Sequence, residues 1–441
     1  MKEPNIAIIG GGCAGLSAAV TLIDQGHSVT LFEAALHLGG RARTVLVEHN
    51  QSKHVLDNGQ HILLGAYQET LGLLHKMGIA ENNAFLRLPL QIRMQSQHEK
   101  PAFLLKPAHQ LPTPFNLLFG FFYCEGLNFS ERLTVIKFVS QLKLSGYKIT
   151  EDIVLEAFLK NNKQNTKLIE MLWEPLCLAA LNTPITLAST QIFLNVLRDT
   201  FTGSKENSDF LLPIVDLSSI LANPLARYFQ SKGGQIHLNS QVRKLLVVGD
   251  GFNVVTKEKI EAFSHVIVAT PASQINKLLN AIPPLQQTCQ QLEAYSYQPI
   301  YTIYIQFPSD TQLPNVMTGL SKKISQWAFD KGQLCGQKGL IAVVISGSGM
   351  HQEMSQDELA EKIIHELQKT FPHLTKPLWH QVIAEKRATF SCTPNLARPA
   401  NHTTQPNLFL AGDYTYADYP ATIEGAIRSG IACANLVNMT S

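Results

Sequence analysis

Apolar and polar positions follow one another in blocks along the chain, and the first blocks predict a strand, a helix and a second strand. Asn5–Ile9 is a short, isoleucine-rich apolar run, which is typical of a buried parallel strand. Leu16–Gln25 has helical spacing, and Gly26 follows it as a C-cap. Ser28–Phe32 predicts a second strand, which ends at Glu33. This order favours a parallel α/β sheet.

Later blocks predict more of this sheet and a second region. Short apolar runs at His265–Pro271 and Asn407–Asp413 each predict a buried strand, and Pro420–Gly430 predicts a helix with small residues on its faces. The remaining pattern predicts helices over Ser130–Leu144, Ile153–Leu159 and Asp357–Lys369, and strands over Pro299–Phe307 and Leu340–Ile345.

A dinucleotide-binding fingerprint lies between the first strand and the first helix. Gly10, Gly12 and Gly15 fill the pattern G-x-G-x-x-G. They permit a tight turn, close approach of a pyrophosphate to the backbone, and close packing of helix on strand, respectively. The helix N-terminus offers free N–H groups to phosphate, and Glu33 is placed to accept hydrogen bonds from a ribose. We therefore expect an ADP-containing ligand, NAD or FAD.

Other glycine-containing turns extend the predicted cofactor site. The pair Gly39-Gly40 before Arg41 suits a loop close to a ligand, with a guanidinium that neutralises phosphate. The cofactor-binding residues that we expect from these motifs are Gly10, Gly12, Cys13, Ala14, Gly15, Glu33, Ala34, Gly39, Gly40, Arg41, Gly59, Gln60, His61, Gly412, Asp413, Thr422, Ile423 and Ala426.

Composition narrows the function classes. The 441 residues include 36 Lys+Arg and 34 Asp+Glu, a net charge of +2, which argues against a nucleic-acid binder. Seven scattered cysteines form no C-x-x-C pair, so we expect no disulfide framework, no metal and a reducing, cytoplasmic setting. The uncharged stretches 4–23 and 107–124 are broken by glycine, proline and polar residues, so we expect neither a secretory peptide nor a membrane-spanning helix.

This ordered set of motifs resembles the flavin amine oxidase and carotenoid desaturase superfamily. The resemblance implies FAD bound by both ends of the chain, with Val242 beside the adenine and the helix after Gly412-Asp413 at the pyrimidine edge of the flavin. Phe390–Pro394 does not match the motif of covalently flavinylated amine oxidases. We therefore expect noncovalent FAD, with Cys392 in a packing role.

The resemblance also implies the architecture. The expected fold class is α/β, with a discontinuous Rossmann-like FAD-binding domain of the glutathione-reductase type and an inserted α+β substrate domain of mixed sheet and helices. We assign residues 1–85, 206–290 and 391–441 to the FAD-binding domain, and residues 86–205 and 291–390 to the substrate-binding domain. No second G-x-G-x-x-G unit is visible, so we do not expect a separate NAD(P)H domain.

Two longer stretches narrow the resemblance. Leu56–Leu71 and Trp173–Pro184 are similar to signatures of the bacterial hydroxysqualene dehydroxylases. Tyr414–Tyr419 departs from the sequence that is usual in this family, which affects the expected substrate contacts near the flavin. Ala34-Ala35 also departs from it, which should affect only phosphate affinity. The resemblance implies reductive removal of an allylic hydroxyl from hydroxysqualene to give squalene, a hopanoid precursor.

This reaction needs a proton donor, because hydroxide is a poor leaving group. His61 follows the predicted strand and turn at Leu56–Gly59 and is the candidate; the alternative is that His61 only hydrogen-bonds backbone or flavin. The competing functions are a carotenoid-type desaturase, an amine oxidase, and a lipid carrier that binds FAD without catalysis.

The implied substrate is a hydrocarbon that dissolves in membranes, and one segment suits contact with a bilayer. Phe115–Tyr123 is mostly aromatic and aliphatic, so it predicts either a peripheral contact at the inner face of the cytoplasmic membrane or a piece of buried core. Enzymes of squalene synthesis are the partner proteins that the resemblance implies.

Overall fold

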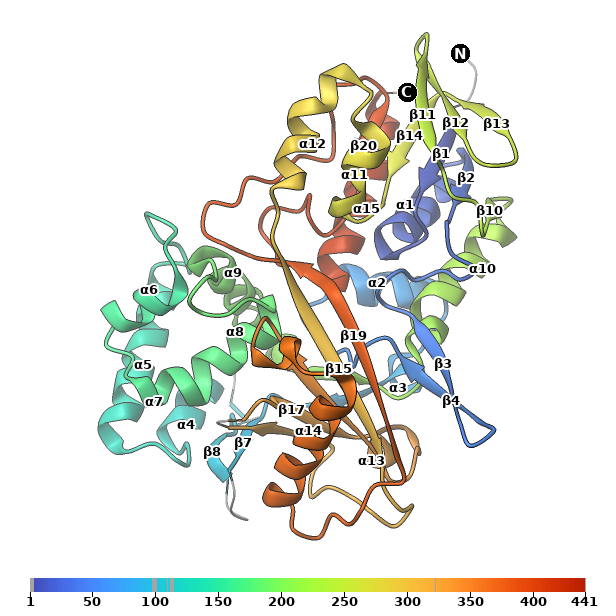
Figure 1. Ribbon diagram of the computed structural model, residues 1–441. Coiled ribbons are helices and arrows are strands. Elements are labelled where there is room, and N and C mark those ends of the chain that lie inside the picture. Colours follow the sequence, from blue (N-terminus) through green and yellow to red (C-terminus); the bar gives the residue numbers. More distant parts are fainter. Residues whose placement is uncertain (1–3, 97–100, 109, 112–114, 322, 441) are drawn as a thin grey trace.

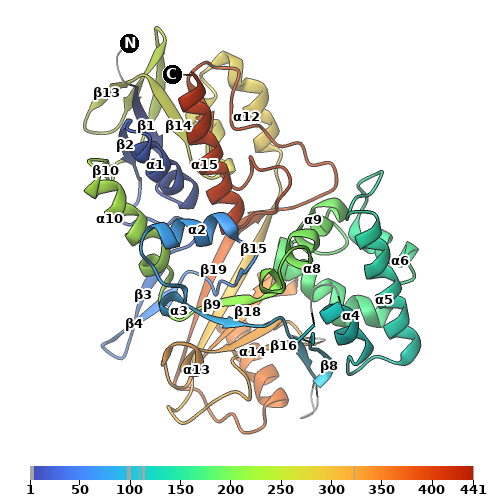
Figure 2. The same cartoon turned by 180° about the vertical axis from the view of Figure 1, so that it is seen from behind.

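Segments from both ends of the chain form one α/β layer of the Rossmann type, which we call the nucleotide-fold layer. It lies beside a large mixed sheet and a group of helices (Figure 1). The computed structural model describes residues 4–96, 101–108, 110–111, 115–321 and 323–440. Seen from behind, helices α1 and α15 lie side by side near the two termini (Figure 2).

The nucleotide-fold layer is a five-stranded parallel sheet assembled from distant parts of the chain. Its order is β10 (Gln235–His237), β2 (Ser28–Phe32), β1 (Asn5–Ile9), β14 (His265–Val268) and β20 (Leu408–Leu410). The helices packed with it are α1 (Cys13–Asp24), α10 (Asn223–Ser231) and α15 (Ile423–Thr440). The expected α/β class with a discontinuous Rossmann-like sheet is confirmed, while the domain boundaries remain a prediction.

Two helices of this layer begin at other residues than the sequence pattern predicts. Helix α1 begins at Cys13 instead of Leu16, because Gly12 is the N-cap and the whole turn after it is helical. Helix α15 begins at Ile423 instead of Pro420. There the side chain of Thr422 accepts the N–H of Gly425 at 3.0 Å, and such an N-cap fixes the start of a helix.

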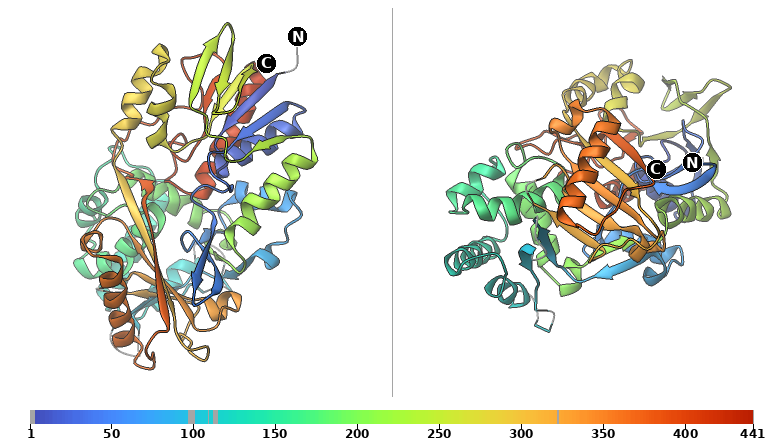
Figure 3. Two further views of the ribbon diagram at one scale, coloured as in Figure 1. Left: turned by 45° about the vertical axis from the view of Figure 1, so that its right-hand side comes forward. Right: turned by 60° about the horizontal axis from the view of Figure 1, so that its bottom comes forward.

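A seven-stranded mixed sheet forms the second layer. Its order is β19 (Trp379–Phe390), β15 (Tyr297–Gln306), β18 (Leu340–Ser346), β17 (Trp327–Asp330), β16 (Met317–Leu320), β7 (Ile92–Gln95) and β8 (Pro101–Leu105). Helix α14 (Gln356–Thr370) covers one face of this sheet (Figure 3). Its apolar side chains, such as Ile363, pack on inward residues such as Ile303, so the other face of the sheet is left for the core that it shares with the nucleotide layer.

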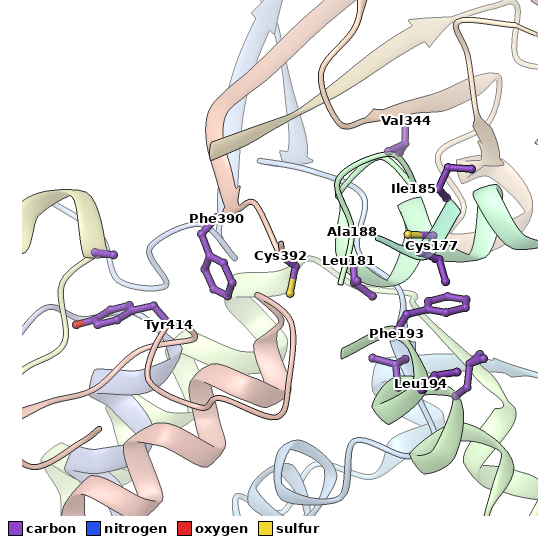
Figure 4. Close-up of a cluster of buried hydrophobic side chains, with 14 of the residues drawn as sticks. Cys177, Leu181, Ile185, Ala188, Phe193, Leu194, Val344, Phe390, Cys392 and Tyr414 are labelled. Carbon is purple, nitrogen blue, oxygen red and sulfur yellow. The ribbon is translucent and has the colours of Figure 1, made fainter. Parts of the chain in front are cut away.

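Helices between β8 and β9 (Phe210–Pro213) form the third region. They are α4 (Phe115–Phe122), α5 (Phe129–Leu144), α6 (Leu155–Asn161), α7 (Thr166–Leu168), a π-helical turn (Ile169–Trp173), α8 (Glu174–Leu181) and α9 (Thr190–Phe201). A continuous apolar cluster joins this region to the nucleotide layer. Figure 4 shows Phe390 and Cys392 between Tyr414 on one side and Leu181 on the other.

Short sheets, hairpins and helices complete the described chain. The strands are β3 (Thr44–His49), β4 (Ser52–Asp57), β5 (Leu63–Leu64), β6 (Phe85–Leu88), β9 (Phe210–Pro213), β11 (Lys244–Val248), β12 (Gly251–Val255) and β13 (Ile260–Phe263). The helices are α2 (Gln68–Lys76), α3 (Glu81–Ala84), α11 (Ala272–Leu279), α12 (Gln286–Glu293) and α13 (Lys331–Cys335).

Candidate FAD site

The first glycine loop has the shape of a cradle for a pyrophosphate. Gly10 has φ +114°, which is a left-handed conformation that favours glycine. A Cβ on Gly15 would lie 1.9 Å from the carbonyl oxygen of Gly10, so helix and strand are in close contact. A Cβ on Gly12 would meet no atom within 4 Å. Gly12 thus borders open space at the N-terminus of α1, where no side chain caps the free N–H groups.

The second glycine pair lies directly beside the first loop. The N–H of Gly39 donates to the carbonyl of Gly11 at 2.8 Å, and Gly39 forms a bridge with Gly12. Gly39 and Gly40 both have positive φ, +103° and +59°. The structure therefore brings these two predicted motifs together around one open space.

Glu33 holds the end of β2 against both motifs. One carboxylate oxygen accepts the N–H of Gly11 at 2.7 Å, and the other accepts the N–H of Ala35 at 2.8 Å. The segment before Val242 lies alongside, because the N–H of Ser240 donates to the carbonyl of Glu33. Val242 is half-buried, so the structure places the predicted adenine end of the site next to the predicted ribose acceptor. Ala34 is exposed.

Arg41 joins the N-terminal motifs to the C-terminal one. Its Nη2 donates to the carboxylate of Asp413 at 2.7 Å, and its Nη1 donates to the carbonyl of Ala388 at 2.6 Å. The carboxylate of Asp413 raises the pKa of the guanidinium. Arg41 is thus paired with a carboxylate rather than free for phosphate, and the predicted phosphate role remains a prediction.

Asp57 supports the turn that carries Gly59, Gln60 and His61. Its carboxylate accepts the N–H of Leu217 at 2.9 Å, and its carbonyl accepts the hydroxyl of Tyr304 at 2.9 Å. Burial raises the pKa of Asp57 to about 6. These contacts tie the turn to two neighbouring segments, which is a structural role.

His61 has one ring nitrogen engaged. Its Nδ1 lies 2.7 Å from the carbonyl oxygen of Gly59, so Nδ1 carries the proton and donates. Burial lowers the pKa of His61, and the nearby charge of Arg41 lowers it further, against the opposing effect of the Gly59 bond. The resting imidazole is therefore neutral at pH 7, with a lone pair on Nε2.

Sequence reasoning missed a buried lysine at this turn. Lys331 is 6% exposed, and its Nζ donates to Oε1 of Gln60 at 3.2 Å. A lysine that directly follows the apolar strand Trp327–Asp330 is the only sequence signal, and it also occurs at ordinary strand ends. Because buried lysines are rare, Lys331 is a candidate for holding the side chain of Gln60 in place.

The C-terminal motif is held by buried hydroxyl groups. The N–H of Gly412 donates to Oγ of Ser429 at 2.8 Å, and Thr415 and Ser429 hydrogen-bond each other at 2.6 Å. These bonds fix the end of β20 against α15, so that Asp413 points to Arg41. Thr422 caps α15, and Ile423 and Ala426 follow in its first turn, which leaves the N-terminus of a helix near the predicted flavin edge.

Cys392 lies in the apolar core between the two layers. It is 1% exposed, and burial raises the pKa of its thiol to about 11. Its Sγ accepts a hydrogen bond from Arg398 at 3.2 Å. These contacts fit the packing role that we expected, and noncovalent flavin binding remains a prediction.

The described residues contain no group of three or more His, Cys, Asp or Glu side chains that could hold a metal ion. In the same part of the chain, every helix is too short or too polar to cross a bilayer.

Comparison with known proteins places this geometry in a family. The model of the family "Flavin containing amine oxidoreductase" matches residues 13–438. The chain belongs to this family. This flavin amine oxidoreductase is 28% identical to a hydroxysqualene dehydroxylase of Zymomonas mobilis, over 97% of this chain and 98% of that protein. It is 26% identical to a 15-cis-phytoene desaturase of Glycine max, over 99% of this chain and 80% of that protein.

Solved structures agree on the fold. Cyclohexylamine oxidase from Brevibacterium oxydans is similar with a TM-score of 0.71 and 15% identity, over 99% of both chains. Membership of the flavin amine oxidoreductase family, together with the dehydroxylase relatives, makes the protein an FAD-dependent oxidoreductase. Its own geometry fits FAD, since the open space at Gly12 borders Gly40, and uncapped N–H groups suit a pyrophosphate.

Proposed function

We propose that the protein removes the allylic hydroxyl of hydroxysqualene reductively and releases squalene. The observation that carries this proposal is the end-to-end correspondence with dehydroxylases. Three bacterial hydroxysqualene dehydroxylases are 26–28% identical, and each is covered over 98% of its length. The plant phytoene desaturases are covered over 78–80% of theirs, and a zeta-carotene desaturase of Synechocystis is covered over 96% of its length at 22% identity. The support for a dehydroxylase is therefore the combination of 26–28% identity with 98% coverage in three dehydroxylases.

Within this proposal, reduced FAD supplies a hydride to the carbon that loses the hydroxyl group. The chain must supply the proton with which the oxygen leaves as water. We assign that proton to Nε2 of His61, the nitrogen that Gly59 does not engage. Because the pKa of His61 is lowered, only the imidazolium that forms at low pH can donate from Nε2.

A carotenoid-type desaturase is the second candidate, and a specific observation supports it. The Glycine max phytoene desaturase is 26% identical to this chain, close to the values for the dehydroxylases. A desaturase would use oxidised FAD and an acyclic hydrocarbon without a hydroxyl group. The direction of electron flow therefore separates the two candidates.

Anaerobic single turnover tests the proposal. The purified flavoprotein is reduced photochemically, hydroxysqualene is added in detergent, and flavin absorbance and products are followed. Reoxidation with formation of squalene is expected. Reduction of oxidised flavin by phytoene would indicate a desaturase, reduction by an amine would indicate an amine oxidase, and a flavin that no substrate changes would indicate a carrier. Any of these three results contradicts the proposal.

The proposed function also suggests where the protein acts. Hydroxysqualene is formed from prenyl diphosphates, so we place the protein next to the enzymes of squalene synthesis, at the inner face of the cytoplasmic membrane. Co-purification from crosslinked cells tests this placement: recovery of a squalene-synthesis enzyme is expected, and its absence from the crosslinked material would contradict it.

A further inference from the structure

Helix α4 and the start of α5 carry an exposed apolar surface. It consists of six side chains that are each 42–69% exposed, which we call the aromatic face: Phe115, Phe119, Phe122, Tyr123, Phe129 and Leu133. Several of the rings touch one another, as Phe122 does with both Tyr123 and Phe129 at centroid distances of 5.2 and 6.3 Å. A contiguous patch of this kind marks a surface that contacts protein or membrane.

The opposite side of α4 closes an apolar cavity. Leu117 and Phe121 are 3% and 5% exposed. They line an enclosed space of about 20 Å³ together with Leu142, Trp173 and Leu197, among other apolar residues. A space of this volume has room for only about one water-sized group, so a hydrocarbon chain enters it only when the apolar side chains around it move apart.

Helix α4 is therefore apolar on both sides. Its one polar side chain, Asn116, is buried and bonds the N–H of Leu117 at 2.8 Å. A helix that is apolar all round belongs in a protein core or in lipid. The outer side of α4 is nevertheless exposed. Because such a helix is unfavourable in water, this exposure indicates that the outer side contacts an apolar environment.

Charge around the aromatic face favours a membrane over a protein partner. Lys106 and Lys137 are exposed near its edges, and Arg132 is held beside Phe122 by a bond from Nη1 to the carbonyl of Phe122 at 3.0 Å. Two acids lie nearby. Glu131 is already used, because it belongs to the capping box of α5 and pairs with Lys167, whereas Glu125 is exposed two residues after Tyr123. The three basic side chains thus outnumber the one available carboxylate. Aromatic side chains bordered by basic ones suit an anionic bilayer surface.

We propose that the aromatic face inserts into an anionic bilayer, and that hydrocarbon passes from the bilayer under α4 by moving apart the apolar side chains that surround the small space behind it. The proposal rests on the proposed function, because only a lipid substrate needs this route. The π-helical turn Ile169–Trp173 contributes Leu172 and Trp173 to the cavity wall. Such irregular turns occur often at functional sites, and this one gives the wall a segment that can adjust to a chain.

Vesicle binding tests the outer half of the proposal. Wild-type holoprotein is expected to sediment with vesicles of phosphatidylglycerol and phosphatidylcholine. The triple variant Phe119→Ser, Phe122→Ser, Tyr123→Ser should bind more than about tenfold more weakly, because three large apolar groups no longer enter lipid. The control variant Leu46→Ser, Ile260→Ser removes two side chains that are 68% and 64% exposed elsewhere, and it should bind like wild type. Flavin absorbance and melting temperature verify folding.

Fluorescence of Trp173 tests the inner half. The chain has three tryptophans, so Trp327→Phe with Trp379→Phe leaves Trp173 as the only one. A dibrominated long-chain alkane presented in vesicles should quench Trp173, while the unbrominated alkane should not. In the matched variant Trp173→Phe, Trp327→Phe, the remaining Trp379 stacks on His49 at 4.4 Å and should not be quenched.

Equal vesicle binding by wild type and the triple variant would overturn the proposal. A wild-type dimer that is lost in the triple variant, as measured by light scattering, would also overturn the proposal, because the aromatic face would then join two copies of the chain. An unquenched Trp173 in a membrane-bound protein would overturn the passage under α4. Failure of the proposed function is distinguishable, since it would leave hydroxysqualene unreactive in detergent whether or not vesicles bind.

Discussion

At the scale of single residues, the two glycines that matter most differ in what surrounds them. Gly15 is required by the fold, because a Cβ there would collide with the backbone of Gly10. Gly12 is not, since a Cβ there meets nothing. We propose that the open space at Gly12 serves the cofactor, because the packing of the protein does not require a glycine there.

Replacing Gly12 with alanine should therefore weaken FAD binding without weakening the fold. We expect at least about a tenfold rise in the Kd of FAD, because the new methyl group occupies the approach of the pyrophosphate. Unfolding of the apoprotein should be unchanged. Gly72→Ala is the matched control: Gly72 is an exposed helical glycine with free space around it, and alanine there should add up to about 1 kcal/mol of stability. Titration with FAD measures the Kd, and thermal melts of the apoprotein measure the stability of each variant. An unchanged FAD affinity in Gly12→Ala would contradict this account.

The proposed proton donor predicts a particular pH dependence. Because the pKa of His61 is lowered, reoxidation of reduced flavin by hydroxysqualene should be fastest at acid pH. It should slow as pH rises through an apparent pKa below the ordinary 6.5. His61→Gln should lose this dependence and about 10²-fold or more in rate, whereas His54→Gln should keep both. Stopped-flow absorbance measures the profile; an unaltered profile in His61→Gln would exclude His61 as the acid.

Residue roles could be predicted from sequence only where the partner is local. Gly10, Gly15 and Glu33 belong to one short motif whose geometry is known in advance. The partner of Arg41 was not predictable, because Asp413 lies 372 positions away. For the same reason Lys331 was missed: its contact with Gln60 spans 271 positions.

At the scale of elements, α15 holds α2 in place, in addition to the flavin contact that we propose for its N-terminus. Its buried Glu424 accepts the N–H groups of Glu69 and Thr70 and the hydroxyl of Thr70, at 2.6–3.1 Å. These are the first-turn donors of α2, which has no side-chain cap of its own. Arg428 completes the pairing at 2.8 Å. One carboxylate thus fastens α2 to α15.

Removing this carboxylate should be costly. Glu424→Ala leaves buried donors without an acceptor and leaves Arg428 with only the more distant carboxylate of Asp199, at 3.9 Å, so we expect a loss of about 3–5 kcal/mol in the free energy of unfolding. Glu361→Ala, on the exposed side of α14, should change it by less than about 0.5 kcal/mol. Denaturant titration compares the two variants, and equal effects would contradict the assigned role of Glu424.

Elements with a strong local period were predictable to within a few residues. The expected helix Asp357–Lys369 is observed as Gln356–Thr370, and the strand Ser28–Phe32 is observed as predicted. Strands β7, β8, β16 and β17 were not predicted, because short strands at the far side of a mixed sheet have little pattern of their own. Their stability comes from pairing with distant strands.

At the scale of the whole molecule, the predicted cofactor site lies where the two ends of the chain meet. The sheet order β10-β2-β1-β14-β20 and the pairing of Arg41 with Asp413 join segments that lie hundreds of residues apart. The sequence motifs predicted this convergence. The motifs did not predict the strand order of the seven-stranded sheet, because that order depends on which distant strands pair.

Stripping FAD should loosen both ends together. A ligand that binds only the folded state at 1,000 times its Kd adds about 4 kcal/mol, so we expect the apoprotein to melt several degrees lower. Hydrogen exchange should rise in residues 10–15, 39–41 and 411–426, and stay unchanged in α14. Mass spectrometry measures this by segment. Faster exchange at one end of the chain only would contradict a site shared by both.

The most direct test of the central claim is the fate of the hydride. In D2O the transferable hydrogen of reduced flavin exchanges with solvent, so anaerobic turnover of hydroxysqualene should give squalene that carries deuterium at the carbon that lost its hydroxyl group. Squalene without deuterium, or no squalene at all while the flavin stays reduced, would contradict the proposed reaction.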